Sequence, residues 1–69
     1  MPGRSLLTRV SDGGRWVVSH GRRVLFCYEA DDIGMRNMAV VAVTDAGVSG
    51  LEAAEVFGLS HEYVSRLRG

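Results

Sequence analysis

The sequence predicts an α+β domain: a three-stranded antiparallel β-meander over residues 5–28, followed by three helices over residues 32–68. In the first half, apolar runs of about six residues alternate with glycine turns. In the second half, capping residues and glycine stops divide amphipathic or apolar stretches. The chain has 69 residues, so we expect a single domain, 1–69, and interpret it as a fragment of a longer protein.

The first half contains the predicted strands SLLTRV, RWVVSH and RVLFCYE, separated by SDGG and GR. Runs rich in Val, Leu and aromatic residues, joined by short glycine-containing turns, are typical of hairpins. In the third run, Val24, Phe26 and Tyr28 share one face, and Leu25 and Cys27 share the other. Because both faces are apolar, we expect this strand to be the central or the best-covered one, with Cys27 as a buried structural thiol.

The segment EADD marks the change from strands to helices. Asp31 or Asp32 can cap a helix N-terminus, where an acidic group also meets the positive end of the helix dipole. The stretch IGMRNMAVVAVTDAG could form a strand, but this cap, its Met and Ala content and the Gly47 stop favour a helix. Residues 38–43 are apolar all round, which predicts burial on two sides, either within the domain or in a subunit contact.

Residues 50–68 are predicted to form a helix-turn-helix. Ser49 and Glu52 make the Ser-x-x-Glu pattern of a capping box at the start of its first helix. Gly58 ends that helix, and Ser60 caps the last helix, which we expect to run over residues 61–68.

Three residues, Ala54, Gly58 and Val64, are expected to set the angle between these two helices. Ala54 is small, which permits a close crossing, and Gly58 can take the left-handed conformation that turns the chain sharply. Val64 faces the core. A turn of three residues sets the crossing angle at about 90–120°, which leaves one helix free to enter a DNA major groove.

The outward side of the last helix carries the candidate DNA-binding residues. Arg66 could pair with guanine or a phosphate, and Glu62 could accept from cytosine N4. Tyr63 is expected to be half packed, with its hydroxyl available to the DNA backbone. Arg22 and Arg23 in a hairpin turn offer secondary phosphate contacts, or form an ordinary solvated turn. The predicted set on the last helix is Ser60, His61, Glu62, Ser65, Arg66 and Arg68.

Composition argues against several other classes of protein. One cysteine excludes an internal disulfide, and with His20 and His61 far apart in sequence it makes no metal-ligand set, so we expect no metal or cofactor. No apolar run approaches the ~20 residues of a membrane span. No catalytic constellation is visible, so the chain is not expected to be an enzyme. Helix capping accounts for the carboxylates of residues 29–32.

Charge is balanced overall but unevenly distributed. Residues 1–28 hold five arginines and one acid, whereas residues 29–69 hold three arginines and seven acids. Every basic residue other than histidine is arginine. Arginine suits bidentate phosphate and base contacts, although coding bias would give the same composition.

Residues 26–68 resemble the N-terminal segment of bacterial transposase-like proteins. The resemblance is carried by the Tyr-x-x-Asp-Asp stretch at 28–32, the mostly apolar helix after it, and the motif AAEVFGLSHEYVSRL. It implies recognition of the end sequences of a mobile element, with His61, Glu62, Ser65 and Arg66 as reading residues. The nuclease domain of such a protein is absent from this sequence.

These observations predict a sequence-specific DNA-binding domain that serves a transposase-like protein in the bacterial cytoplasm, associated with the nucleoid. Double-stranded DNA is the expected partner, and a homodimer is left open. One alternative is a fragment of a transcriptional regulator. An alternative of another class is a protein-interaction or dimerisation module that uses helix 33–44 and the sheet and does not bind DNA.

Overall fold

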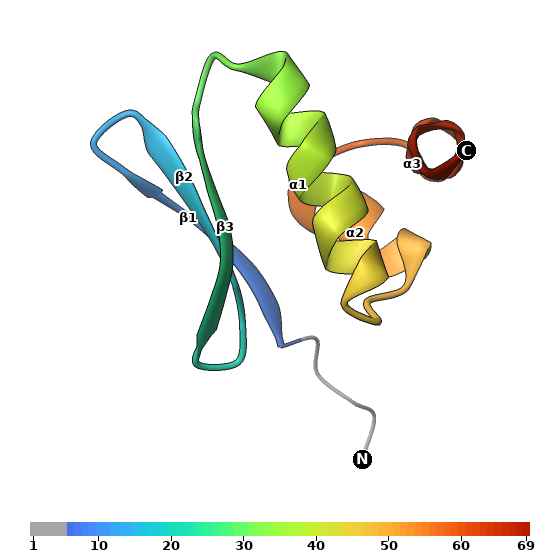
Figure 1. Ribbon diagram of the computed structural model, residues 1–69, viewed down its shortest axis with the longest axis horizontal. Helices are drawn as coiled ribbons and strands as arrows, with labels where there is room; N and C mark the ends of the chain where they lie inside the picture. The colour runs from blue at the N-terminus through green and yellow to red at the C-terminus, as the bar shows by residue number, and fades with distance from the viewer. Residues whose placement is uncertain (1–5) are drawn as a thin grey trace.

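In the computed structural model, which describes residues 6–69, a three-stranded sheet precedes three helices (Figure 1). The elements are β1 Leu7–Asp12, β2 Arg15–His20, β3 Arg23–Glu29, α1 Ile33–Asp45, α2 Gly50–Phe57 and α3 His61–Arg68. The predicted α+β fold is therefore confirmed. Residue 5, where the predicted meander begins, lies outside the described residues.

The sheet is an antiparallel meander with the strand order β1-β2-β3. β1 continues two residues beyond the predicted run because the turn is confined to Gly13 and Gly14. Both glycines have left-handed φ angles, 60° and 82°. Two such residues in succession suit the tight turn whose twist matches that of the flanking strands.

The prediction for β3 needs two corrections. β2 is the central strand of the described sheet, and β3 lies at its edge with α1 packed against it. The pairing of β2 with β3 also shifts between Val18 and Ser19, because Leu25 has no partner there. This bulge breaks the alternation, so Leu25 and Phe26 both pack against the core while Val24 is exposed.

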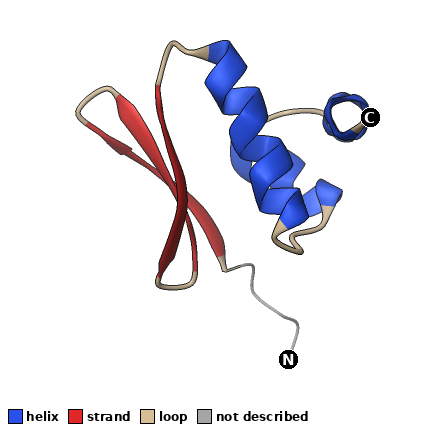
Figure 2. Ribbon diagram, viewed as in Figure 1, coloured by secondary structure: helices blue, strands red, loops and turns tan. Residues whose placement is uncertain are grey.

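Cys27 is exposed, so the expectation of a buried thiol is wrong. Its neighbour Tyr28 is buried, and successive residues of a strand point to opposite faces. The helices lie on one side of the sheet, as Figure 2 shows. Tyr28 is on that side, because its ring stacks with that of Phe57 in α2, and no described element covers the other side. An apolar pattern on both faces of β3 therefore does not mean that both faces are covered.

α1 forms as predicted. Asp32 caps it, its side chain accepting a hydrogen bond of 3.0 Å from the backbone N–H of Met35. Beyond the last turn, Gly47 has φ 103° and the N–H of Val48 donates to the carbonyl of Val43 at 3.1 Å, which is the hydrogen bond of a Schellman stop. The helix packs against β3, α2 and α3, which bury Ala39, Val40 and Val43, but Met38 is 58% exposed. The predicted burial of residues 38–43 on two sides is therefore only partly correct.

Arg9 joins the sheet to the helices. Its guanidinium lies 4.0 Å from the centre of the Trp16 ring and 5.4 Å from that of Phe57 in α2. Its Nη1 donates to the hydroxyl of Tyr28 at 3.1 Å, and the Tyr28 and Phe57 rings stack at 6.3 Å. Arginine over aromatic faces is favourable when the contact is partly desolvated. Trp16 is half-buried against the core.

Candidate nucleic-acid interface

The bend between α2 and α3 has the predicted backbone conformation. Gly58 adopts the left-handed conformation, with φ 69° and ψ 34°. Its N–H donates to the carbonyl of Glu55 at 3.3 Å, and the N–H of Leu59 donates to that of Ala54 at 2.9 Å. Together these bonds make a Schellman motif, which ends α2 sharply and directs the chain away from its axis.

Small residues allow the two helices to approach closely. Ala53 and Ala54 are buried in the same core cluster as Val64, which is fully buried. A methyl group added at Gly50 would lie 3.5 Å from Nε2 of His61 and 3.7 Å from Cγ1 of Val64. These are ordinary contact distances, so α2 and α3 pack closely through Val64 and the ring of His61 while leaving room for one methyl group at Gly50.

The polar side of α3 faces solvent. α3 packs against α1 and α2, and Figure 1 shows the sheet on the far side of α1. Val64 and Leu67 supply its inward contacts. The predicted DNA-binding residues are all exposed, namely Ser60, His61, Glu62, Ser65, Arg66 and Arg68.

The N-termini of α2 and α3 lie side by side. The close approach of His61, the first residue of α3, to Gly50, the first residue of α2, brings them together. The hydroxyls of Ser49 and Ser60 cap these ends, each accepting at 3.1 Å from the N–H three residues on. Each N-terminus carries about half a positive charge from the helix dipole, which the carboxylates of Glu52 and Glu62 in the two first turns partly offset.

The opposite flank of α3 meets α1 through a cluster that the sequence did not indicate. Asn37 Nδ2 donates to the hydroxyl of Tyr63 at 3.1 Å, and Arg36 Nη2 donates to it at 3.3 Å. The guanidinium of Arg36 also donates twice to Oδ1 of Asn37, at 2.9 and 3.2 Å. The Tyr63 hydroxyl is thus engaged within the protein, which corrects the expectation that it is available to DNA.

Arg36 is the residue that the sequence reasoning missed. It lies beside Tyr63 on α3, 27 residues away in the chain, and it is only partly buried. Its ring contact with Tyr63, at 5.7 Å, holds a positive charge next to the exposed side of α3. One signal was present in the sequence: Arg36 is the only basic residue between Arg23 and His61.

Arg22 and Arg23 lie elsewhere in the molecule. Both are exposed at the β2–β3 turn. In Figure 1 this turn lies at the bottom of the view, and α3 lies at the upper right beyond α1. The structure therefore does not bring this pair together with the candidate residues of α3.

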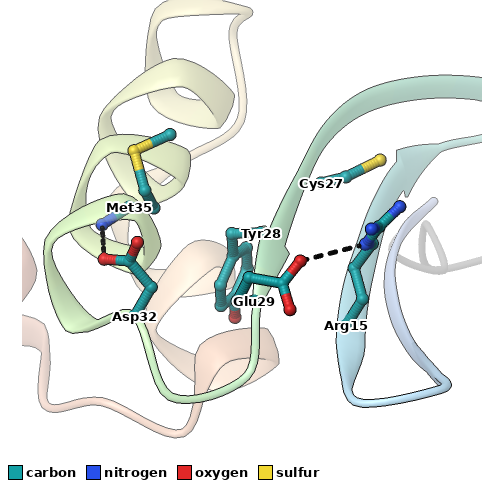
Figure 3. Close-up of a pocket in the computed structure, with 6 residues that line it drawn as sticks. All are labelled: Arg15, Cys27, Tyr28, Glu29, Asp32 and Met35. Atoms are coloured by element: carbon teal, nitrogen blue, oxygen red, sulfur yellow. Dashed lines mark hydrogen bonds and ion pairs between the residues drawn. The ribbon is translucent and has the colours of Figure 1, made fainter.

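The carboxylates near β3 have structural partners (Figure 3). Glu29 pairs with Nε of Arg15 at 3.3 Å, and Asp32 caps α1. They border a hollow of about 300 Å³ that also includes Cys27, whose side chain points away from Asp32 in Figure 3. Across residues 6–69, no three His, Cys, Asp or Glu side chains gather closely enough to hold a metal ion.

No helix in the described part of the chain is both long and apolar enough to cross a membrane. Comparison of the chain with protein-family models, with curated proteins and with solved structures gives no match. The interface must therefore be interpreted from its own geometry and chemistry.

Proposed function

We propose that this chain is a DNA-binding domain that docks α3 in the major groove of a duplex. One observation carries the proposal: five polar residues of α3, together with its N-cap Ser60, are exposed where the left-handed Gly58 turns the chain away from α2. The major groove of B-DNA is wide enough to admit an exposed α-helix.

The exposed residues in the middle of α3 would contact the bases. Arg66 can donate two hydrogen bonds to O6 and N7 of guanine, and Glu62 can accept one from N4 of cytosine. Ser65 lies one helical turn after Glu62, on the adjacent side of the helix, and can donate or accept. All three are exposed, so binding would not first require them to leave a partner in the core.

Phosphate contacts would come from both flanks of α3. On one side, the adjacent N-termini of α2 and α3 present backbone N–H groups and favour negative charge. On the other side, Arg36 is held against Tyr63 and keeps further N–H donors for a phosphate oxygen. The proposal thus adds Arg36 to the predicted site and leaves Arg22 and Arg23 outside the main docking surface.

The proposed interface has no excess positive charge, even when Arg36 is included. α2 and α3 contain Glu52, Glu55 and Glu62 against Arg66 and Arg68. Because phosphate neutralisation supplies most non-specific affinity, we expect weak binding to arbitrary DNA, with a Kd of about 10⁻⁴ M at physiological salt. Higher affinity would require the correct site or a second copy of the domain.

The resemblance of residues 26–68 to transposase-like proteins supports a role in recognising the ends of a mobile element. This chain would then supply DNA recognition, and catalysis would belong to another part of the protein. A transcriptional regulator would use the same docking geometry. Either function would place the protein in the bacterial cytoplasm, at the nucleoid.

A titration of labelled duplex DNA at low ionic strength, followed by fluorescence anisotropy, tests the proposal. Arg66→Ala should weaken binding by about 1–3 kcal/mol if the residue reads a base, or lower the salt slope by about one if it contacts a phosphate. Arg22→Ala is the matched control, because it removes the same charge from an exposed site outside α3. Equal losses in the two variants would argue against docking through α3.

A further inference from the structure

The positive charge of Arg36 has no carboxylate partner within residues 6–69. In this part of the chain an ion pair joins Arg15 to Glu29, whereas Arg36 contacts neutral groups. These are the amide oxygen of Asn37, the hydroxyl of Tyr63 and the face of the Tyr63 ring. Neutral acceptors orient a guanidinium but do not cancel its charge, so the charge of Arg36 remains available to an anion.

Asn37 fixes the position of this guanidinium. Adjacent residues of a helix point about 100° apart, so Arg36 and Asn37 meet because the long arginine side chain reaches across to α3. Arginine only donates hydrogen bonds, and both of its contacts with Asn37, at 2.9 and 3.2 Å, are with the amide oxygen. The amide nitrogen Nδ2 is left to donate to the hydroxyl of Tyr63 at 3.1 Å. One amide therefore ties the arginine to the flank of α3.

Part of the guanidinium stays unused. The hydrogen bonds to Asn37 and Tyr63 come from Nε and Nη2 of Arg36. Nη1 carries two further N–H groups, and these have no partner within residues 6–69. A phosphate oxygen is well suited to such donors, because a hydrogen bond between two charged groups is stronger than one between neutral groups.

We propose that Asn37 is the positioning residue of a phosphate-binding site at Arg36, an inference that rests on the proposed function. The ligand is a phosphodiester oxygen of the DNA backbone beside the groove that α3 enters. Holding Arg36 in place before binding reduces the entropy that its side chain would lose in the complex. The amide is essential to the site, because a carboxylate in its place would hold Arg36 as firmly and cancel its charge.

Two substitutions of Asn37 separate charge from position in a titration with duplex DNA. Asn37→Asp keeps the size of the side chain and adds a negative charge, so the salt slope should fall by about 0.9, as in Arg36→Gln. Asn37→Ala leaves the charge of Arg36 but frees its side chain, so affinity should fall about two- to tenfold at an unchanged slope. The matched control is Arg22→Gln, which makes the same change in net charge as Asn37→Asp at an exposed site outside α3 and should keep the wild-type slope.

Urea titration of the same variants distinguishes this site from a merely structural cluster. Asn37→Asp should be at least as stable as wild type, because its contact with Arg36 becomes an ion pair between α1 and α3. A structural role alone would leave the salt slope of Asn37→Asp at the wild-type value.

Inorganic phosphate tests the site without DNA. The arginine Nε–H signals in NMR spectra should show Arg36 saturating at a lower phosphate concentration than Arg22. This difference should disappear in Asn37→Asp, because the added carboxylate competes with the anion. An equal response of Arg36 and Arg22 in the wild-type chain would overturn the proposed site.

The outcomes separate this inference from the proposed function. If Arg66→Ala weakens DNA binding but Asn37→Asp keeps the wild-type salt slope, docking through α3 stands and the role of Asn37 is overturned. If phosphate saturates Arg36 in a chain that binds no DNA at low ionic strength, the proposed function is overturned and the anion site at Arg36 and Asn37 stands.

Discussion

The helical half and the sheet half of this molecule are stabilised in different ways. In the helical half, small buried alanines let α2 and α3 pack closely, and a Schellman motif fixes the bend between them. In the sheet half, one face packs on the helices and the other is open to solvent. The helix-turn-helix is thus specified by backbone constraints, whereas the sheet is held by large aromatic side chains on one side.

This difference predicts which substitutions will destabilise the protein most. The two halves meet where Phe57 of α2 contacts Arg9 and Tyr28 of the sheet, and that contact depends on a few large groups. Within the helical half, the geometry depends on the left-handed φ angle of Gly58 and on the small buried residues Ala53 and Ala54. Substitutions at the junction should therefore cost the most, those at the bend less, and those at the polar edge of α3 least.

The largest effect is expected from Phe57→Ala. It removes a buried ring between the helices and the sheet, a change that costs about 3–5 kcal/mol. A domain of this length has about 3–10 kcal/mol of stability in total, so the variant should be largely or partly unfolded in a urea titration followed by circular dichroism. Leu51→Ala, at an exposed site of the same helix, should change stability by no more than about 0.5 kcal/mol.

Substitution of the two glycines of the helix-turn-helix by alanine is expected to have an intermediate effect on stability, and the effect should differ between the two sites. Gly58→Ala forces a left-handed φ on alanine and should cost about 1–2 kcal/mol, although the space around it is open. Gly50→Ala meets His61 and Val64 at ordinary contact distances and should be neutral or stabilising by up to about 1 kcal/mol. Urea titration of both measures the difference, and similar costs at the two sites would contradict a bend set by φ.

The smallest effect belongs to Tyr63→Phe. It removes the hydroxyl that Arg36 and Asn37 share, worth about 0.5–1.5 kcal/mol at a partly buried site. Thermal unfolding compared with Ser65→Ala, an exposed position on the same helix, isolates the cluster. A variant as stable as wild type would mean that solvent replaces these bonds without loss.

Much of this fold could be predicted because local signals agreed with one another. Asp32, Ser49 and Ser60 each cap the helix that follows them, and capping depends on neighbouring residues only. The left-handed glycine of the bend is equally local. Exposure of the candidate residues on α3 followed from the helical period once Val64 was assigned to the core.

The incorrect and missing assignments were those that depended on contacts between distant segments. The exposure of Cys27 depends on how many layers cover the sheet, and the bulge at Leu25 depends on its pairing with β2. The cluster of Arg36 with Tyr63 depends on how α1 crosses α3. None of these follows from periodicity or from a capping motif.

The central claim is that the exposed side of α3 meets DNA, and mapping of backbone amide shifts by NMR during a duplex titration tests it most directly. The account predicts the largest shifts over residues 60–66, at the N-terminus of α2 and at Arg36, with the sheet nearly unchanged. Largest shifts at the β2–β3 turn, or no shifts even at low ionic strength, would contradict it.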